Sequence, residues 1–394
     1  MAILEHQRTH PSPTLLVSRG KLSGLDPDRR GLLTLVMFFL TQILYGQTGV
    51  LSTLKPDGAT EPARILAVSD EAALDRFVPN EGVVELMFES LLQGFTNTAH
   101  PKEAWEQFLQ PEDVVGIKVL CEPGRLSGTR PAVVKAVIRS LGKAGVAPSR
   151  VVVWDRRLGP MLASGYGSLR EELGVRLAGA QEEGYDSEVF YEAPLVGQLV
   201  FGDLEFGKAN EAGVGRRSFV TKILTQQVSR ILVIHPLINH YRGGVHGNLV
   251  GLSRGAFDNF LRFEVDQDRF NQAVVEAIAL PEVFDKFAFS LSDALICQYQ
   301  GEERGFLQYS KAFQSLRMSR DMVAMDVRAL SDLQDLRRQA SLPVETSVQT
   351  LYENAQLLEL GIADTSRIRM DFLHRLPSGA ESSPVSKGSE KVRP

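Results

Sequence analysis

The chain has 394 residues, of which 43% are hydrophobic and 23% are charged. This length and composition predict a soluble globular protein with one large domain or two ordinary ones. The net charge of −5 argues against nucleic-acid binding through bulk electrostatics. The two cysteines, Cys121 and Cys297, are too few for a disulfide framework, an all-cysteine zinc site or a cysteine-ligated iron–sulfur cluster.

The N-terminal segment, residues 1–50, has the layout of an export signal. Arg29 and Arg30 precede a moderately apolar run at 31–44, and this arrangement resembles a twin-arginine signal. Two positions of that motif differ here, and no clean cleavage site follows. We expect the twin-arginine machinery to export the protein to the periplasm or cell envelope, with the signal either cleaved or kept as a membrane tether. The alternative is that the apolar run forms a buried helix of the fold.

The body of the chain alternates between predicted strands and helices. A β-branched run predicts a strand at 114–120, and Pro131 opens a helix at 132–141. A second strand is predicted at 151–155. Strand, helix and strand together indicate a βαβ unit, in which the two strands are parallel.

The same alternation continues downstream. We expect strands at 230–234, 287–293, 322–326 and 368–372, and helices at 270–278 and 353–359. The pattern predicts an α/β domain over 62–375, with a mostly parallel sheet, flanking helices and two lobes with a cleft between them. Residues 376–394 are rich in serine, glycine, proline and charge, which predicts a disordered tail.

The loops at the carboxyl ends of the strands are where open α/β sheets bind ligands. The loop 121–131 joins a predicted strand to a helix N-terminus, where free backbone N–H groups favour an anion. A carboxylate or phosphate is the expected ligand, held by cationic and hydroxyl side chains. The anion-binding residues would be Lys118, Arg125, Thr129 and Arg130. The alternative is an N-capping turn with solvated arginines.

Three of the seven histidines lie between residues 235 and 248, after another predicted strand. Neutral imidazoles ligate transition metals and act as acids or bases near neutral pH. We expect His240 and His246 to be catalytic. The spacing matches no zinc motif, so a divalent metal would need a carboxylate from elsewhere. The candidate metal ligands are His235, His240, His246 and Asp258. The alternative is a tight glycine turn with hydrogen-bonded histidines.

Several segments of the body carry a family resemblance. They are Gly116-Ile117-Lys118-Val119, Thr129-Arg130-Pro131, the Asn239-His240 turn, residues 255–263 and residues 319–326. Together they resemble the family called domain of unknown function three-sixty-two, over residues 110–372. Members often carry twin-arginine signals, and their function is not established. The resemblance therefore implies export but no particular activity.

A more distant likeness adds a chemical expectation. The helix opened by Pro131 and the turn His240-Tyr241-Arg242-Gly243-Gly244 are similar to the N-terminal domain of the lactate racemase family. That family binds a nickel pincer cofactor through a lysine ten residues after the histidine that matches His240. Val250 stands at this position, and no histidine occurs at 156–159, where a proton-transferring one would fall. The likeness therefore implies the fold and the anion loop, but not the pincer chemistry.

Two functions from different classes follow. In the first, the protein is an enzyme that acts on a small anionic organic acid, with a histidine-based proton transfer or metal site. In the second, the same fold is a non-catalytic ligand-binding or scaffold protein.

Overall fold

The computed structural model describes residues 61–193, 217–344 and 346–373. The predicted signal at 1–50 and the predicted tail at 376–394 lie outside these residues. Within them, no helix is both long enough and apolar enough to cross a membrane.

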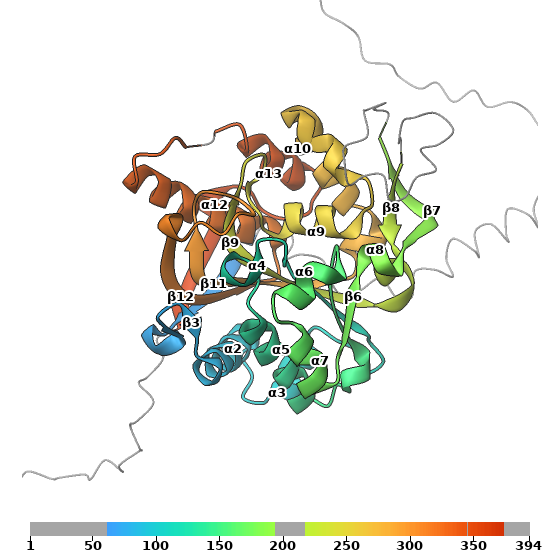
Figure 1. Cartoon of the computed structure of the whole chain (residues 1–394), viewed down its shortest axis with the longest axis vertical. Helices are drawn as coiled ribbons and strands as arrows, with labels where there is room; N and C mark the ends of the chain where they lie inside the picture. Colours follow the sequence, from blue (N-terminus) through green and yellow to red (C-terminus); the bar gives the residue numbers. More distant parts are fainter. Residues whose placement is uncertain (1–60, 194–216, 345, 374–394) are drawn as a thin grey trace, which may run out of the picture. The chain divides into compact units, whose positions relative to one another are not determined.

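One sheet organises the described residues (Figure 1). Its strands are β1 (Ala63–Ser69), β4 (Val115–Lys118), β5 (Val151–Asp155), β6 (Arg176–Gly179), β9 (Arg230–His240), β10 (Gly244–Val245), β11 (Phe287–Gln298), β12 (Ser310–Ser319) and β13 (Ile368–Leu373). The order across the sheet is β13-β1-β12-β11-β9-β4-β5-β6, with β10 beside β9. Every neighbouring pair from β11 to β6 is parallel, and β12 runs against both of its neighbours. The predicted α/β class with a mostly parallel sheet is confirmed.

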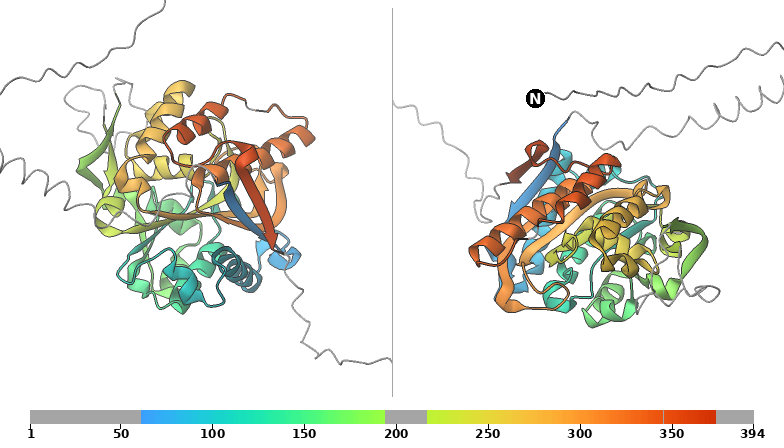
Figure 2. Two further views of the ribbon diagram at one scale, coloured as in Figure 1. Left: turned by 180° about the vertical axis from the view of Figure 1, so that it is seen from behind. Right: turned by 90° about the horizontal axis from the view of Figure 1, so that it is seen from above.

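Helices cover both faces of the sheet (Figure 1), and Figure 2 shows the same two layers from behind. On one face lie α2 (Glu81–Thr96), α3 (Pro101–Glu106), α5 (Pro131–Lys143) and α7 (Gly167–Leu173). On the other lie α9 (Asn248–Ala256), α10 (Gln267–Ile278), α12 (Met322–Gln339) and α13 (Gln349–Leu357). Shorter elements are α4 (Gly124–Ser127), α6 (Leu158–Ala163), α8 (Ala180–Glu183), α11 (Pro281–Phe284) and the strand pairs β2 (Leu74–Asp75) with β3 (Val78–Pro79) and β7 (Tyr185–Glu192) with β8 (Arg217–Thr221).

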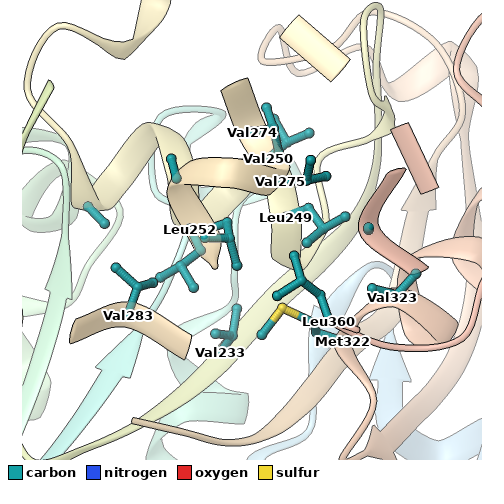
Figure 3. Close-up of a cluster of buried hydrophobic side chains, with 14 of the residues drawn as sticks. Val233, Leu249, Val250, Leu252, Val274, Val275, Val283, Met322, Val323 and Leu360 are labelled. Carbon is teal, nitrogen blue, oxygen red and sulfur yellow. The ribbon is translucent and has the colours of Figure 1, made fainter. Parts of the chain in front are cut away.

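The central strand β9 supplies side chains to both hydrophobic cores. Ile231 and Val233 pack on the side of α9 and α10, whereas Leu232 and Ile234 pack on the side of α5. This alternation is the two-residue period of a strand that is buried on both faces. Figure 3 shows Val233 below the apolar side chains of α9. The described residues are organised around one large sheet and fall in a single compact unit, so the predicted two-lobe division is not confirmed.

The strand predicted at 322–326 is wrong, because these residues open the helix α12. The Asp321 side chain caps this helix by accepting the backbone N–H of Ala324 at 2.8 Å. Buried positions then recur at helical spacing at Met325, Ala329 and Leu333. A short apolar run is compatible with either a buried strand or a buried helix, and the residues beyond it decide between them.

The loop predicted after Ile234 is also partly wrong, because β9 continues to His240. The pairing of β9 with β4 ends at Lys118 and Val233. Pro236, which has no backbone N–H to donate, lies beyond this point and therefore costs the β4–β9 ladder no hydrogen bond. Two of the three clustered histidines therefore belong to a strand. His246 follows β10, which turns back and pairs with the end of β9.

Candidate functional site

A cavity of about 200 Å³ lies at the carboxyl ends of β4 and β5, the edge where open α/β sheets bind ligands. Its basic lining residues are Lys118, Arg156, Arg157 and Arg254. Its acidic lining residues are Glu122, Asp155 and Glu303, and His246, Gly251 and Gly255 complete the polar and glycine part of the wall. The cavity therefore combines four basic side chains with three acidic ones and a histidine.

Two of the lining residues, Lys118 and Asp155, form a buried ion pair. Lys118 Nζ donates to Asp155 Oδ1 at 2.8 Å and to the carbonyl oxygen of Val119 at 2.6 Å. The second oxygen of Asp155 accepts the backbone N–H of Cys121 at 2.7 Å. Only 2% of the Lys118 side chain is exposed, and its ammonium lies 5.6 Å from the centre of the Trp154 ring. These contacts fix the cation at one position.

Gly255 gives Lys118 the space to reach Asp155. A Cβ added at Gly255 would lie 2.1 Å from Lys118 Cε and 2.8 Å from Lys118 Nζ. We expect Gly255→Ala to lower the free energy of unfolding by about 1–3 kcal/mol, because the held ammonium cannot move aside without breaking its ion pair. Urea unfolding followed by circular dichroism measures the change.

Gly142→Ala is the matched control for this substitution. Gly142 lies in α5, and its added Cβ would meet nothing within 4 Å. An alanine there is expected to stabilise the helix by about 0.5–1 kcal/mol. Equal stabilities of the parent and Gly255→Ala would show that the close approach to Lys118 is not a constraint.

His246, another lining residue, lies between a donor and an acceptor. Its Nε2 is 3.2 Å from Arg254 Nη1 and 3.4 Å from Glu303 Oε1. Arg254 also pairs with Glu303, and its Nε lies 3.1 Å from Glu264 Oε1. A neutral Nε2 can accept from the arginine or donate to the carboxylate, so it has a partner with or without its proton.

Burial lowers the pKa of His246 below its ordinary value of 6.5, and the charge of Arg254 lowers it further. The hydrogen bond to Glu303 acts in the opposite direction and is outweighed. The His246 imidazole is therefore neutral at pH 7 and can accept a proton. Burial alone would raise the pKa of Glu303. The hydrogen bond with His246 and the charge of Arg254 outweigh burial and hold this pKa well below the usual range.

Of the four predicted anion-binding residues, only Lys118 lines the cavity. Arg130 Nη1 donates to Asp293 Oδ1 at 2.9 Å, and its backbone N–H donates to Asp293 Oδ2 at 2.9 Å. Thr129 Oγ1 donates to the carbonyl of Ile234 and accepts the N–H of Leu120. Arg125 is exposed on α4, outside the cavity wall. Thr129 and Arg130 therefore tie the loop to the sheet. The capping-turn alternative does not describe them either, because Arg130 is buried and ion-paired instead of solvated, and as the N-cap residue of α5 it makes no side-chain capping hydrogen bond.

The predicted metal ligands do not come together. In the described part of the chain, no group of three or more His, Cys, Asp or Glu side chains is arranged to hold a metal ion. His235 is held between the Pro236 carbonyl and the Asn248 amide, and burial lowers its pKa to about 4. Asp258 accepts the backbone N–H of Phe219 at 2.8 Å. Each of these two side chains is committed to its own part of the fold.

His240, the second predicted catalytic residue, does not line the cavity. Its Nδ1 accepts the N–H of Gly243 at 3.0 Å, and its ring stacks on Phe270. Its ring edge meets His246 at 5.4 Å between centroids. His240 therefore closes the turn between β9 and β10 and packs behind His246.

The likeness to the lactate racemase family predicts a lysine at position 250, where this chain has valine. The side chain of Val250 lies in the apolar cluster beside α10 (Figure 3). Only 1% of it is exposed, and a Cβ at Gly243 would lie 2.4 Å from Val250 Cγ2. A valine offers no amine for a covalent link, and its side chain is buried. The residues do not fit a nickel pincer, and the chemistry proposed below does not use one.

Several charged lining residues were not among the predicted site residues, among them Glu122, Arg156, Arg157, Arg254 and Glu303. Arg156 and Arg157 directly follow β5, so the rule for strand ends selects them. Gly251 and Gly255 lie four residues apart on α9 and hence on one face, which is a signal for close approach to that helix. Glu303 lies on the loop between β11 and β12, and no local pattern marks it.

No protein-family model and no curated protein matches the chain. A crystal structure of a Thermotoga maritima protein, solved by the Northeast Structural Genomics Consortium, is similar to 67% of this chain, with 14% sequence identity and a TM-score of 0.36. The chain spans 60% of the length of that protein. Both family resemblances therefore stay predictions.

Proposed function

We propose that the protein is an enzyme that binds a small carboxylic acid in the cavity and uses His246 to transfer a proton. The observation that carries this proposal is the position of His246 Nε2, at the wall of a cationic cavity and between Arg254 and Glu303. A buried imidazole that is neutral at pH 7 can accept a proton from a bound acid.

The charge and size of the cavity support an anionic ligand of few atoms. Its four basic and three acidic side chains leave an excess of one positive charge, without counting His246. A volume of about 200 Å³ is smaller than the roughly 300–1,000 Å³ typical of sites for drug-sized molecules. A carboxylate with a short carbon chain matches both properties.

The arrangement of His246 supports proton transfer. In the ligand-free cavity, a protonated Nε2 can donate to Glu303 and an unprotonated Nε2 can accept from Arg254, so both protonation states of His246 have a partner. A carboxylate beside the imidazole also stabilises the imidazolium that forms. A positioned acid or base of this kind contributes about 10²–10⁴-fold in rate.

A non-catalytic binding protein is the second candidate, and the paired charges favour it. Lys118 is paired with Asp155, Arg157 with Glu122, and Arg254 with Glu303. Such a preformed network fixes the positions of polar groups before a ligand arrives. The two candidates share the ligand and differ in whether His246 reacts.

Isothermal titration calorimetry with acetate, propionate, lactate and succinate tests the shared part of this proposal. We expect one carboxylate to bind per chain, and Lys118→Met to weaken that binding at least tenfold because it removes a cation from the cavity wall. Circular dichroism checks that Lys118→Met stays folded, since the change leaves Asp155 without its partner.

Arg125→Ala is the matched control, because Arg125 is an exposed cation on the neighbouring loop that does not line the cavity. Its affinity should equal that of the parent. Equal losses in Lys118→Met and Arg125→Ala would move the anion site to the loop 121–131 and away from the cavity.

A further inference from the structure

Glu303 is the most exposed member of the group around His246. Its side chain is 33% exposed, compared with 2% for His246 and 16% for Arg254. Its carboxylate nevertheless contacts both of these buried side chains. A carboxylate attached to a methylene group therefore reaches from the cavity rim to Arg254 and Nε2. This is the chemical shape of a small aliphatic acid.

The backbone beside Glu303 is held independently of its side chain. Gln298 Nε2 donates to the carbonyl oxygens of Glu302 at 2.8 Å and Arg304 at 2.9 Å. The N–H of Glu302 donates to Asn239 Oδ1 at 3.0 Å. The Glu303 side chain can therefore turn away while the loop keeps its place.

Arg254 keeps a second carboxylate when Glu303 turns away. Its Nε pairs with Glu264, whose side chain is only 13% exposed. The guanidinium would thus stay oriented, with Nη1 free to bind another carboxylate. Two carboxylates cannot share Nη1 and Nε2 without strong repulsion, so an incoming acid and Glu303 exclude each other.

We infer that the Glu303 carboxylate occupies the place of the ligand's carboxylate, and that a bound acid displaces it from Arg254 and His246. This inference rests on the proposed function and narrows its substrate class to monocarboxylic acids with a C–H bond next to the carboxylate. Replacement of one carboxylate by another leaves the charge of the cavity unchanged. In the displaced form, the carboxylate of the ligand takes the place of the Glu303 carboxylate beside Nε2 and stabilises the imidazolium in its stead.

Removal of the internal competitor should tighten ligand binding. We expect Glu303→Ala to bind propionate about tenfold more tightly than the parent, and Glu303→Gln to bind it at least threefold more tightly, both by calorimetry. Glu112→Ala is the control, because Glu112 is an exposed carboxylate that does not line the cavity. Its affinity should equal that of the parent.

Unchanged or weaker propionate binding in both Glu303 variants would overturn the inference, since Glu303 would then support the site without competing for it. In that case the proposed function survives, because the parent still binds the acid. Failure of propionate to bind to the parent and to both variants would overturn the proposed function together with the inference. Glu303→Gln keeps the side-chain size, so the test stands even where Glu303→Ala does not fold.

Discussion

Asp293→Ala is expected to lower the free energy of unfolding by about 3–5 kcal/mol, because it leaves Arg130 buried without its partner. The two side chains are 0% and 3% exposed. Asp293 also accepts the backbone N–H of Arg130, so its loss removes two hydrogen bonds to one residue. Urea unfolding followed by circular dichroism gives the magnitude.

Asp335→Ala is the matched control for this prediction. Asp335 pairs with Arg338 at the surface of α12, where both side chains are more than half exposed. Such pairs contribute about 0–1 kcal/mol. If Asp293→Ala lowered the free energy of unfolding no more than Asp335→Ala does, the assignment of a structural role to Arg130 would be wrong. Should the single variant fail to fold, the double variant Arg130→Met/Asp293→Leu is expected to fold, because it removes both buried charges together.

His246→Asn is expected to lower the rate of proton exchange on a bound acid by about 10²–10⁴-fold. Asparagine keeps a polar side chain of similar size but cannot take up the proton. His100→Asn is the control, because His100 is exposed at the start of α3, away from the cavity. A comparable loss of rate in both variants would remove His246 from its proposed role.

The pH dependence of the parent follows from the direction of the His246 shift. Burial places the pKa of His246 below 6.5, so the neutral base is present at pH 7. The exchange rate should be highest at neutral pH and decline on acidification, with the midpoint of the decline below pH 6.5. The groups that contact His246 are Arg254, Glu303 and His240, and burial also holds the pKa of His240 well below 6.5, so the His240 ring does not gain a charge before the pH falls below that value. A decline centred above pH 6.5 would contradict the assignment.

The βαβ unit from β4 to β5 was predictable because its signals are local. Val115–Lys118 and Val151–Asp155 are β-branched runs with clear ends, and Pro131 marks a helix start. The rule that ligands bind at the carboxyl ends of strands then selects the edge of the sheet where the cavity lies, and Lys118 stands at that edge. This much of the candidate site depends on neighbours in the sequence.

The remaining site contacts join residues far apart in the chain. Arg130 is 163 residues from Asp293, and no local pattern says that this arginine is paired within the fold. Glu303 reaches His246 only because the loop between β11 and β12 passes over the end of β9. The sequence spacing of the three histidines likewise predicts a single loop, because spacing alone cannot show that β9 continues past Pro236.

Proton exchange on a bound acid tests the central claim most directly. The parent is incubated with saturating propionate or lactate in D₂O, and proton NMR follows the signal of the hydrogen next to the carboxylate. The account predicts that this signal decays with time in the parent and persists in His246→Asn. An acid that binds in the cavity and keeps this hydrogen indefinitely would contradict the enzyme and leave the non-catalytic binding protein as the better description.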